Sequence, residues 1–170
     1  FLTFTGRTDL VDAARLAGSI GHAQGRLGHH EEAITGMRAA LDVLGTDDRD
    51  PDVAAINCDL GRALLFTGHL DEAGAAIERA LGAAEALELP VLTCQALGLK
   101  AIHLEYVGRY EEARTLHDGA IALGERHKVP RRHVALQNAS VLRITQDMPG
   151  AVESCEVALA AARQRGDRSG

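Results

Sequence analysis

The feature that most constrains this chain is a motif that returns every forty residues. Its three clear copies are LGHHEEAITGMRAAL, TGHLDEAGAAIERAL and VGRYEEARTLHDGAI, which begin at residues 27, 67 and 107. Each copy has a glycine, then an acidic pair, then two alanines seven residues apart. A fixed period of this length indicates a stack of similar units, each of which buries its apolar side only against its neighbours. A fourth, weaker copy at 145–159 has Gln146 where the glycine is expected.

Prolines mark the same period independently. Pro51, Pro90 and Pro130 each open an apolar stretch, at the first helical turn where a proline has no hydrogen bond to lose. Asp50 is a suitable N-cap before Pro51, and Thr8 is the expected cap of the first helix. The acidic pairs fall at helix starts, where the helix dipole favours negative charge. The expected helices are 8–26, 30–45, 51–66, 70–87, 90–106, 110–127, 130–144 and 148–165.

The composition favours an all-α protein and excludes several function classes. Aromatic residues make up only 3% of the chain, while alanine, leucine and glycine are abundant, so small residues are available for close helix packing. The net charge of -6 gives no attraction to nucleic acid or to an acidic membrane surface. No apolar run is long enough to span a bilayer. The cysteines, Cys58, Cys94 and Cys155, have no metal-ligand spacing, which predicts buried, reduced thiols in a cytoplasmic protein.

The stretch AGSIGHAQGRLGHHEEA, from residue 17 to 33, contains four glycines and resembles two kinds of site by composition. It lacks the GK[ST] ending and the preceding strand of a phosphate loop, so a helix and its turn are the better interpretation. His29 and His30 resemble metal ligands, but neighbouring side chains in a turn point in different directions. The paired carboxylates have no apolar pocket that would separate their pKa values, and no nucleophile has a catalytic local motif. We therefore expect no enzymatic activity, no metal and no cofactor.

The units resemble tetratricopeptide repeats over about residues 14 to 165. In the first unit the matching small residues are Gly21, Gly28, Ala33 and Ala40. The resemblance implies a right-handed α-solenoid of four helix-turn-helix repeats in one domain spanning 1–170, as part of a longer chain. The forty-residue period exceeds the standard length of about 34 residues. The longer helices are similar to those in large bacterial transcription regulators, peptide-responsive regulators and kinesin light chains. The implied repeats are 8–46, 50–88, 89–128 and 129–166.

The resemblance also implies that a ligand binds along a concave groove formed by the first helix of each repeat. Gly18 and Gly25 fall on this side and are expected to clear the groove, which would admit a ligand or residues 1–6. The arginines predict a basic groove for an acidic peptide, with a scatter of solvated arginines as the alternative. The implied groove residues are Arg15, His22, Arg26, Arg62, Phe66, Gln95, Glu105, Tyr106, His133 and Arg143.

These observations favour a non-catalytic scaffold or sensor of a bacterial regulatory protein that binds a protein or peptide segment, with no direct contact to nucleic acid or membrane. The chaperone-binding carboxylate clamp of the family is not matched, because its key positions fall on Gly18, His22 and Asp59. Two alternatives stay open. The first is a small-molecule or signal-peptide sensor that controls an attached effector. The second is a self-association module that forms a homodimer through the open ends of the solenoid.

Overall fold

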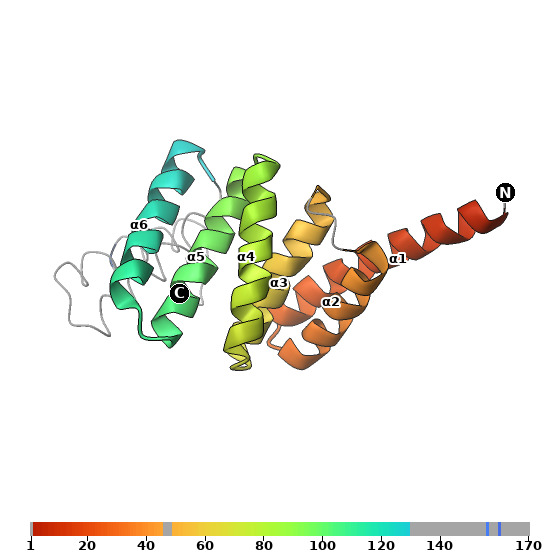
Figure 1. Cartoon of the computed structure of the whole chain (residues 1–170), viewed down its shortest axis with the longest axis horizontal. Coiled ribbons are helices and arrows are strands. Elements are labelled where there is room, and N and C mark those ends of the chain that lie inside the picture. Colours follow the sequence, from red (N-terminus) through yellow and green to blue (C-terminus); the bar gives the residue numbers. More distant parts are fainter. Residues whose placement is uncertain (1, 46–48, 130–155, 157–159, 161–170) are drawn as a thin grey trace. The chain divides into compact units, whose positions relative to one another are not determined.

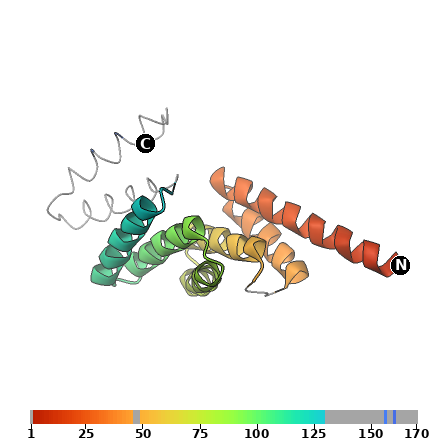
Figure 2. The same cartoon turned by 90° about the horizontal axis from the view of Figure 1, so that it is seen from above.

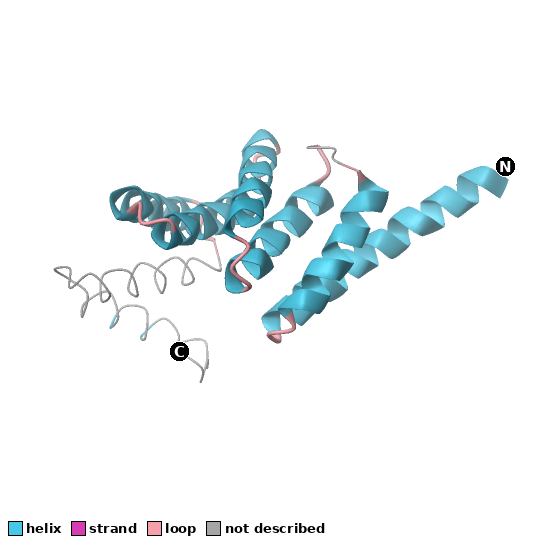
Figure 3. Ribbon diagram, turned by 60° about the horizontal axis from the view of Figure 1, so that its bottom comes forward, coloured by secondary structure: helices cyan, strands magenta, loops and turns pink. Residues whose placement is uncertain are grey.

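The computed structural model describes residues 2–45, 49–129, 156 and 160, and this part of the chain is helical with short connecting loops (Figure 3). It contains six helices instead of the expected eight, because the expected helices 130–144 and 148–165 lie outside the described residues, apart from residues 156 and 160. No helix within the described ranges is long and apolar enough to cross a membrane. The helices are α1 (Leu2–Arg26), α2 (His30–Leu44), α3 (Pro51–Phe66), α4 (Leu70–Ala86), α5 (Pro90–Tyr106) and α6 (Tyr110–Arg126).

The chain divides into two compact units, Phe1–Leu92 and Thr93–Gly170. In the first unit α1 pairs with α2 and α3 pairs with α4, and α3 also packs against α1 and α2 (Figure 1). Because α3 contacts three helices, apolar and small residues occupy most of its circumference, including buried Val53, Leu60 and Leu64. The single-domain prediction for 1–170 and the repeat boundaries stay predictions.

Helix boundaries follow the local signals, with one exception. The Asp50 carboxylate accepts a hydrogen bond of 2.8 Å from the backbone N–H of Asp52, which confirms Asp50 as the cap ahead of Pro51. Thr8, in contrast, is not a cap, because α1 is continuous from Leu2. No proline interrupts residues 2–8, so nothing in the sequence stops the helix there. The start of α1 extends past α2 (Figures 1 and 2). Because α1 is one continuous helix, residues 2–6 are not folded back on Gly18 and Gly25.

The repeated glycine closes each hairpin turn. Gly28 and Gly68 have φ values of +87° and +81°, and Gly108 in the second unit has +79°. Residues with a Cβ rarely adopt this backbone conformation, so the motif glycine is required by the turn. After Gly28 the backbone N–H of His29 donates to the carbonyl of Gln24 at 3.0 Å, which satisfies a carbonyl at the end of α1.

In the second unit α5 and α6 are joined by two apolar clusters and one polar contact. Ala101 and Leu104 pack with Ala113 in one cluster, and Cys94 packs with Ala120 and Val129 in the other. His117 of α6 is buried, and its Nε2 donates to Oε1 of Glu105 at 2.7 Å. The small residues of the repeat motif therefore form the contact between helices, as in the first unit.

Glycines inside the helices allow close approach within each hairpin. A Cβ placed on Gly61 would lie 2.6 Å from Cγ1 of Ile77, and one on Gly21 would lie 2.7 Å from Cγ of Met37. Ile77 and Met37 are fully buried, so neither side chain has space to move away. The repeat position predicted to be small is thus small because another helix occupies the space of its side chain.

We expect Gly61→Ala to lower the free energy of unfolding by about 1–3 kcal/mol, because overpacking against Ile77 exceeds the gain in helix propensity. Gly82→Ala is the matched control, since Gly82 has no neighbour within 4 Å of an added Cβ. It should stabilise the protein by about 1 kcal/mol. Urea unfolding followed by circular dichroism measures both, and equal effects of the two substitutions would contradict the close approach.

Candidate functional site

The predicted groove residues of α1 lie along its contact with α3, which we call the α1–α3 seam. Arg15 forms ion pairs with Asp50 at 3.2 Å and with Asp52 at 2.8 Å, at the start of α3. Two turns further along α1, Nδ1 of His22 donates to Oδ2 of Asp59 at 2.6 Å. The structure therefore places both side chains on one edge of α1, in contact with α3.

Gly18 is a packing residue, so the expectation that it clears a groove is wrong, whereas the same expectation for Gly25 stays a prediction. A Cβ on Gly18 would lie 2.5 Å from Cδ1 of Ile56, so its missing side chain is replaced by Ile56 of α3. The reason is that Gly18 lies on the side of α1 that α3 covers. A Cβ on Gly25 would make only an ordinary contact, 3.8 Å from the Cβ of Ala33 on α2.

The basic face expected from the sequence is largely neutralised by aspartates. Asp59 accepts from His22 through one carboxylate oxygen and from Nη1 of Arg62, at 3.1 Å, through the other. All three side chains are partly buried. Of the predicted groove arginines in the described residues, Arg15 and Arg62 are thus paired within the chain, while Arg26 is exposed and has no ion pair with a described residue.

Arg26, His30 and Phe66 form a second group, which we call the turn-end cluster. Phe66 ends α3 and stacks on the ring of His30 at the start of α2, with ring centroids 5.0 Å apart and an angle of 14° between the planes. Phe66 nevertheless stays 64% exposed. Nδ1 of His30 is buried and has no hydrogen-bond partner among the described residues. Arg26 ends α1 and is separated from His30 only by the turn.

The predicted groove residues of the second unit are in different environments. Glu105 is bound to the buried His117, so it stabilises the α5–α6 hairpin. Tyr106 is exposed and Gln95 is half-buried, so both belong to the surface of α5. His133 and Arg143 lie outside the described residues.

Sequence reasoning missed the acceptors that pair with the basic residues. Asp59 enters the sequence-based prediction only as a departure from the chaperone-binding clamp, and Asp52 has no part in it. A local signal existed for Asp59, because an aspartate three residues before Arg62 on a helix is within reach of it. The contact with His22 has no such signal, because it depends on the packing of two helices that are 37 residues apart in sequence.

The described residues offer little for nucleophilic or metal chemistry. Burial raises the pKa of the Cys58 thiol from 9.0 to about 12, against a smaller opposing effect of the nearby Arg62. Burial also raises the pKa of Cys94, whose Sγ donates to the carbonyl of Ala120. Reactive cysteines have lowered pKa values, so these two thiols have the opposite character. No group of three or more His, Cys, Asp or Glu in the described ranges is arranged to hold a metal ion.

The pKa of Cys58 predicts slow alkylation of the native protein and a loss of stability in alkali. At about pH 8 iodoacetamide should modify Cys58 far more slowly in the folded protein than in urea, as resolved by peptide mass spectrometry.

Because the folded pKa of Cys58 exceeds the unfolded value of 9.0, the stabilisation that the neutral thiol gives is complete below pH 9 and is lost as the pH rises toward 12. Cys58→Ala should flatten the fall in unfolding free energy between about pH 8 and 10.5. An unchanged fall in this variant would refute the raised pKa.

Asp59→Ala should lower the free energy of unfolding by about 1–3 kcal/mol, because it removes an acceptor shared by two basic side chains. Asp42→Ala is the control, because Asp42 is exposed on α2, and it should change the free energy of unfolding by about 0.5 kcal/mol or less. Chemical denaturation of the two variants measures the difference. A loss at Asp59 no larger than that at Asp42 would show that the seam contributes nothing to stability.

Comparison with known proteins agrees with this geometry. A family model described as tetratricopeptide repeat matches residues 54–87, which include nearly all of α3 and α4. No curated protein matches the sequence at a significant level. The match places one tetratricopeptide repeat at residues 54–87, and the similar solved structures below share the fold that the repeat motif predicted.

Several solved structures share the fold at low sequence identity. A Rap protein complexed with competence and sporulation factor is 17% identical, with a TM-score of 0.82 over 92% of this chain and 44% of that one. Aspartyl phosphate phosphatase F from Bacillus subtilis is 16% identical, with a TM-score of 0.69 over 93% of this chain and 42% of that one. A TPR-like protein from Chlorobium tepidum is 22% identical, with a TM-score of 0.62, and the two chains are covered to 94% and 98%. This chain therefore spans less than half of the length of the first two proteins, and the likeness concerns the fold.

Proposed function

We propose that the chain is a non-catalytic module that binds a protein or peptide segment, as the scaffold or sensor part of a cytoplasmic bacterial regulatory protein. Its fold is one on which such binding occurs, since a similar Rap protein structure is complexed with competence and sporulation factor. In this proposal residues 129–166 complete an array of four repeats and eight helices. The array forms a right-handed solenoid whose ligand lies on the side of the first helices.

The observation that carries the proposal is the turn-end cluster. Phe66 presents an aromatic ring that is 64% exposed and is held flat by its stack on His30. A ring fixed in this way loses little conformational entropy when a ligand covers it, and aromatic and arginine side chains dominate binding energies at interfaces. Arg26 lies at the same end of the first unit, and because it is exposed, its guanidinium is available to an external partner.

The ion pairs of the seam limit how many arginines are available to bind a ligand. Arg15 and Arg62 are paired with aspartates, so they add little net positive charge to the surface. Arg26 remains for a bidentate contact with a carboxylate. The preferred ligand in this proposal is a peptide segment that carries an acidic residue next to an apolar one, so that the first meets Arg26 and the second meets Phe66.

Selection of peptides from a random heptapeptide library against the 170-residue chain tests this proposal. Peptides with an acidic residue beside an apolar one should be enriched. Their affinity, measured by fluorescence anisotropy, should fall at least about tenfold in Arg26→Glu and in Phe66→Ala, which is a loss of about 1.4 kcal/mol. Both side chains are exposed, so circular dichroism should show an unchanged fold.

Arg126→Glu is the matched charge control, because Arg126 is an exposed arginine at the end of α6 in the other unit. It should leave the affinity of the selected peptides unchanged. Equal losses in Arg26→Glu and Arg126→Glu would show a general charge effect and contradict a site at the turn-end cluster. Failure to enrich any peptide over an unrelated helical protein would contradict peptide binding itself.

A further inference from the structure

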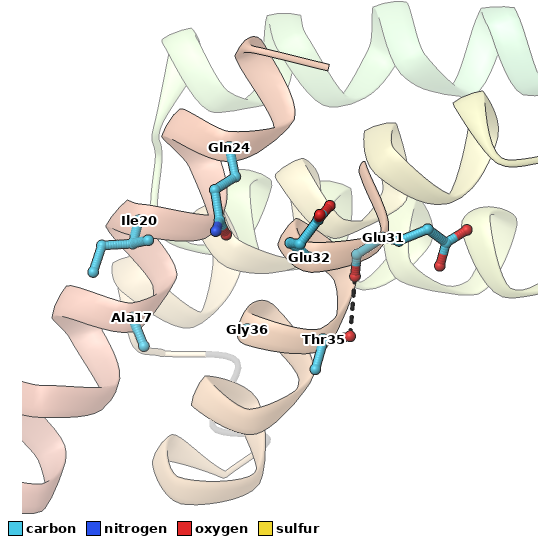
Figure 4. A pocket seen from close by; sticks show the side chains of 7 residues that line it. All are labelled: Ala17, Ile20, Gln24, Glu31, Glu32, Thr35 and Gly36. Atoms are coloured by element: carbon cyan, nitrogen blue, oxygen red, sulfur yellow. Dashed lines mark hydrogen bonds between the residues drawn. The ribbon is translucent and has the colours of Figure 1, made fainter. Parts of the chain in front are cut away.

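The side of the α1–α2 hairpin away from α3 is an open surface, which we call the first-hairpin face. Its centre is a hollow lined by residues of both helices (Figure 4). Ile20 of α1 is 50% exposed and Leu16, one turn before it, is 63% exposed. Two large apolar side chains exposed next to each other on one edge of a helix indicate a surface that another element covers. The residues that line the hollow are Ala17, Ile20, Gln24, Glu31, Glu32, Thr35 and Gly36.

The forty-residue repeat shows what covers such a face. Leu16 and Ile20 correspond to Ile56 and Leu60 of α3, which are only 6% and 4% exposed. In the second hairpin these positions face the first: α3 packs on both α1 and α2, and Ile56 fills the space that Gly18 leaves open. The first hairpin therefore presents apolar residues at the positions where the second hairpin uses apolar residues to pack against its neighbour.

Two acidic residues also repeat with the forty-residue spacing, and their copies in the second hairpin form ion pairs with the first hairpin. Asp52 of the second hairpin pairs with Arg15 of α1 at 2.8 Å, and Glu72 pairs with Arg38 of α2. Their equivalents forty residues earlier are Asp12 and Glu32, both exposed on the first-hairpin face. Exposed ion pairs of this kind contribute little stability, but they set the position and orientation of the element that docks.

We infer that the first-hairpin face binds an α-helical hairpin that presents a small residue opposite Leu16 and two arginines, one on each helix, opposite Asp12 and Glu32. The required surface is of the kind that Arg15 and Gly18 present to α3 and that Arg38 presents to α4. A single helix does not satisfy both acids, because the two arginines that pair with Asp52 and Glu72 come from different helices. A second copy of this chain is disfavoured, because its own Arg15, Gly18 and Arg38 are already engaged with the second hairpin.

A tandem chain provides a partner of this chemistry. This engineered chain joins an added copy of residues 1–48 to the start of a receiving copy, residues 9–170, so the forty-residue period is kept. The added copy then offers the first-hairpin face of the receiving copy a hairpin with the required arginines and glycine. The tandem chain should unfold in one transition with a Tm about 4 °C or more above that of the natural chain, because the new contact buries Leu16 and Ile20. Hydrogen exchange at α1 of the receiving copy should slow.

Two sets of variants make the test specific. Leu16→Glu with Ile20→Glu in the receiving copy should abolish the gain in Tm, whereas the same pair in the natural chain should shift Tm by only about 1–2 °C. Asp12→Arg with Glu32→Arg in the receiving copy should reduce the gain, and Arg15→Glu with Arg38→Glu in the added copy should restore it. Restoration would identify the two ion pairs as the contacts that set the register.

Two results would overturn the inference. The first is a tandem chain that melts at the temperature of the natural chain and whose added hairpin is cleaved rapidly by protease. The second is a natural chain that light scattering shows to be a dimer and that Leu16→Glu with Ile20→Glu converts to a monomer, because the face would then serve a second copy. Binding of the selected peptides at the turn-end cluster should be the same in the natural and tandem chains, so this test is independent of the proposed function.

Discussion

Close approach of helices at residues without a side chain determines most of this structure. Gly61 leaves space for Ile77, Gly21 leaves space for Met37, and Gly18 leaves space for Ile56. The first two contacts hold the helices of a hairpin together, and the third holds one hairpin against the next. The cost of glycine within a helix, about 1 kcal/mol each, is offset by the burial of a large apolar side chain, which contributes about 1.5–3 kcal/mol.

The polar contacts of the first unit depend on this apolar packing. Once Ile56 lies against Gly18, α1 and α3 are close enough for Arg15 to reach Asp52 and for His22 to reach Asp59. These contacts satisfy basic side chains that would otherwise give the surface a positive charge. Phe66 and Arg26 stay exposed at one end of the unit, and they are the residues that we propose for contact with a ligand.

The same contacts explain why the two sides of the first hairpin differ. Its side toward α3 is filled, with Gly18 and Arg15 engaged. Its other side carries equivalents of buried and ion-paired residues of the second hairpin, but Leu16 is exposed. A repeat protein reuses one surface at each junction, so a surface that is open in one repeat has a defined complement in the next. The turn-end cluster, in contrast, has no counterpart of this composition in the other hairpins that the structure describes, which is consistent with the proposed role in recognition rather than in stacking.

Local patterns in the sequence predict the all-α class, the hairpin repeat, the turn glycines and the Asp50 cap, because each of these depends on residues a few positions apart. They also place Arg15 and His22 on one side of α1, since helical periodicity decides which residues share a side. The packing of Gly18 against Ile56, the pairing of Asp59 with both Arg62 and His22, and the contact of Glu105 with His117 are visible only in the folded structure. These outcomes depend on the rotation and distance between helices, which result from the sum of many side-chain contacts and have no signature in local spacing.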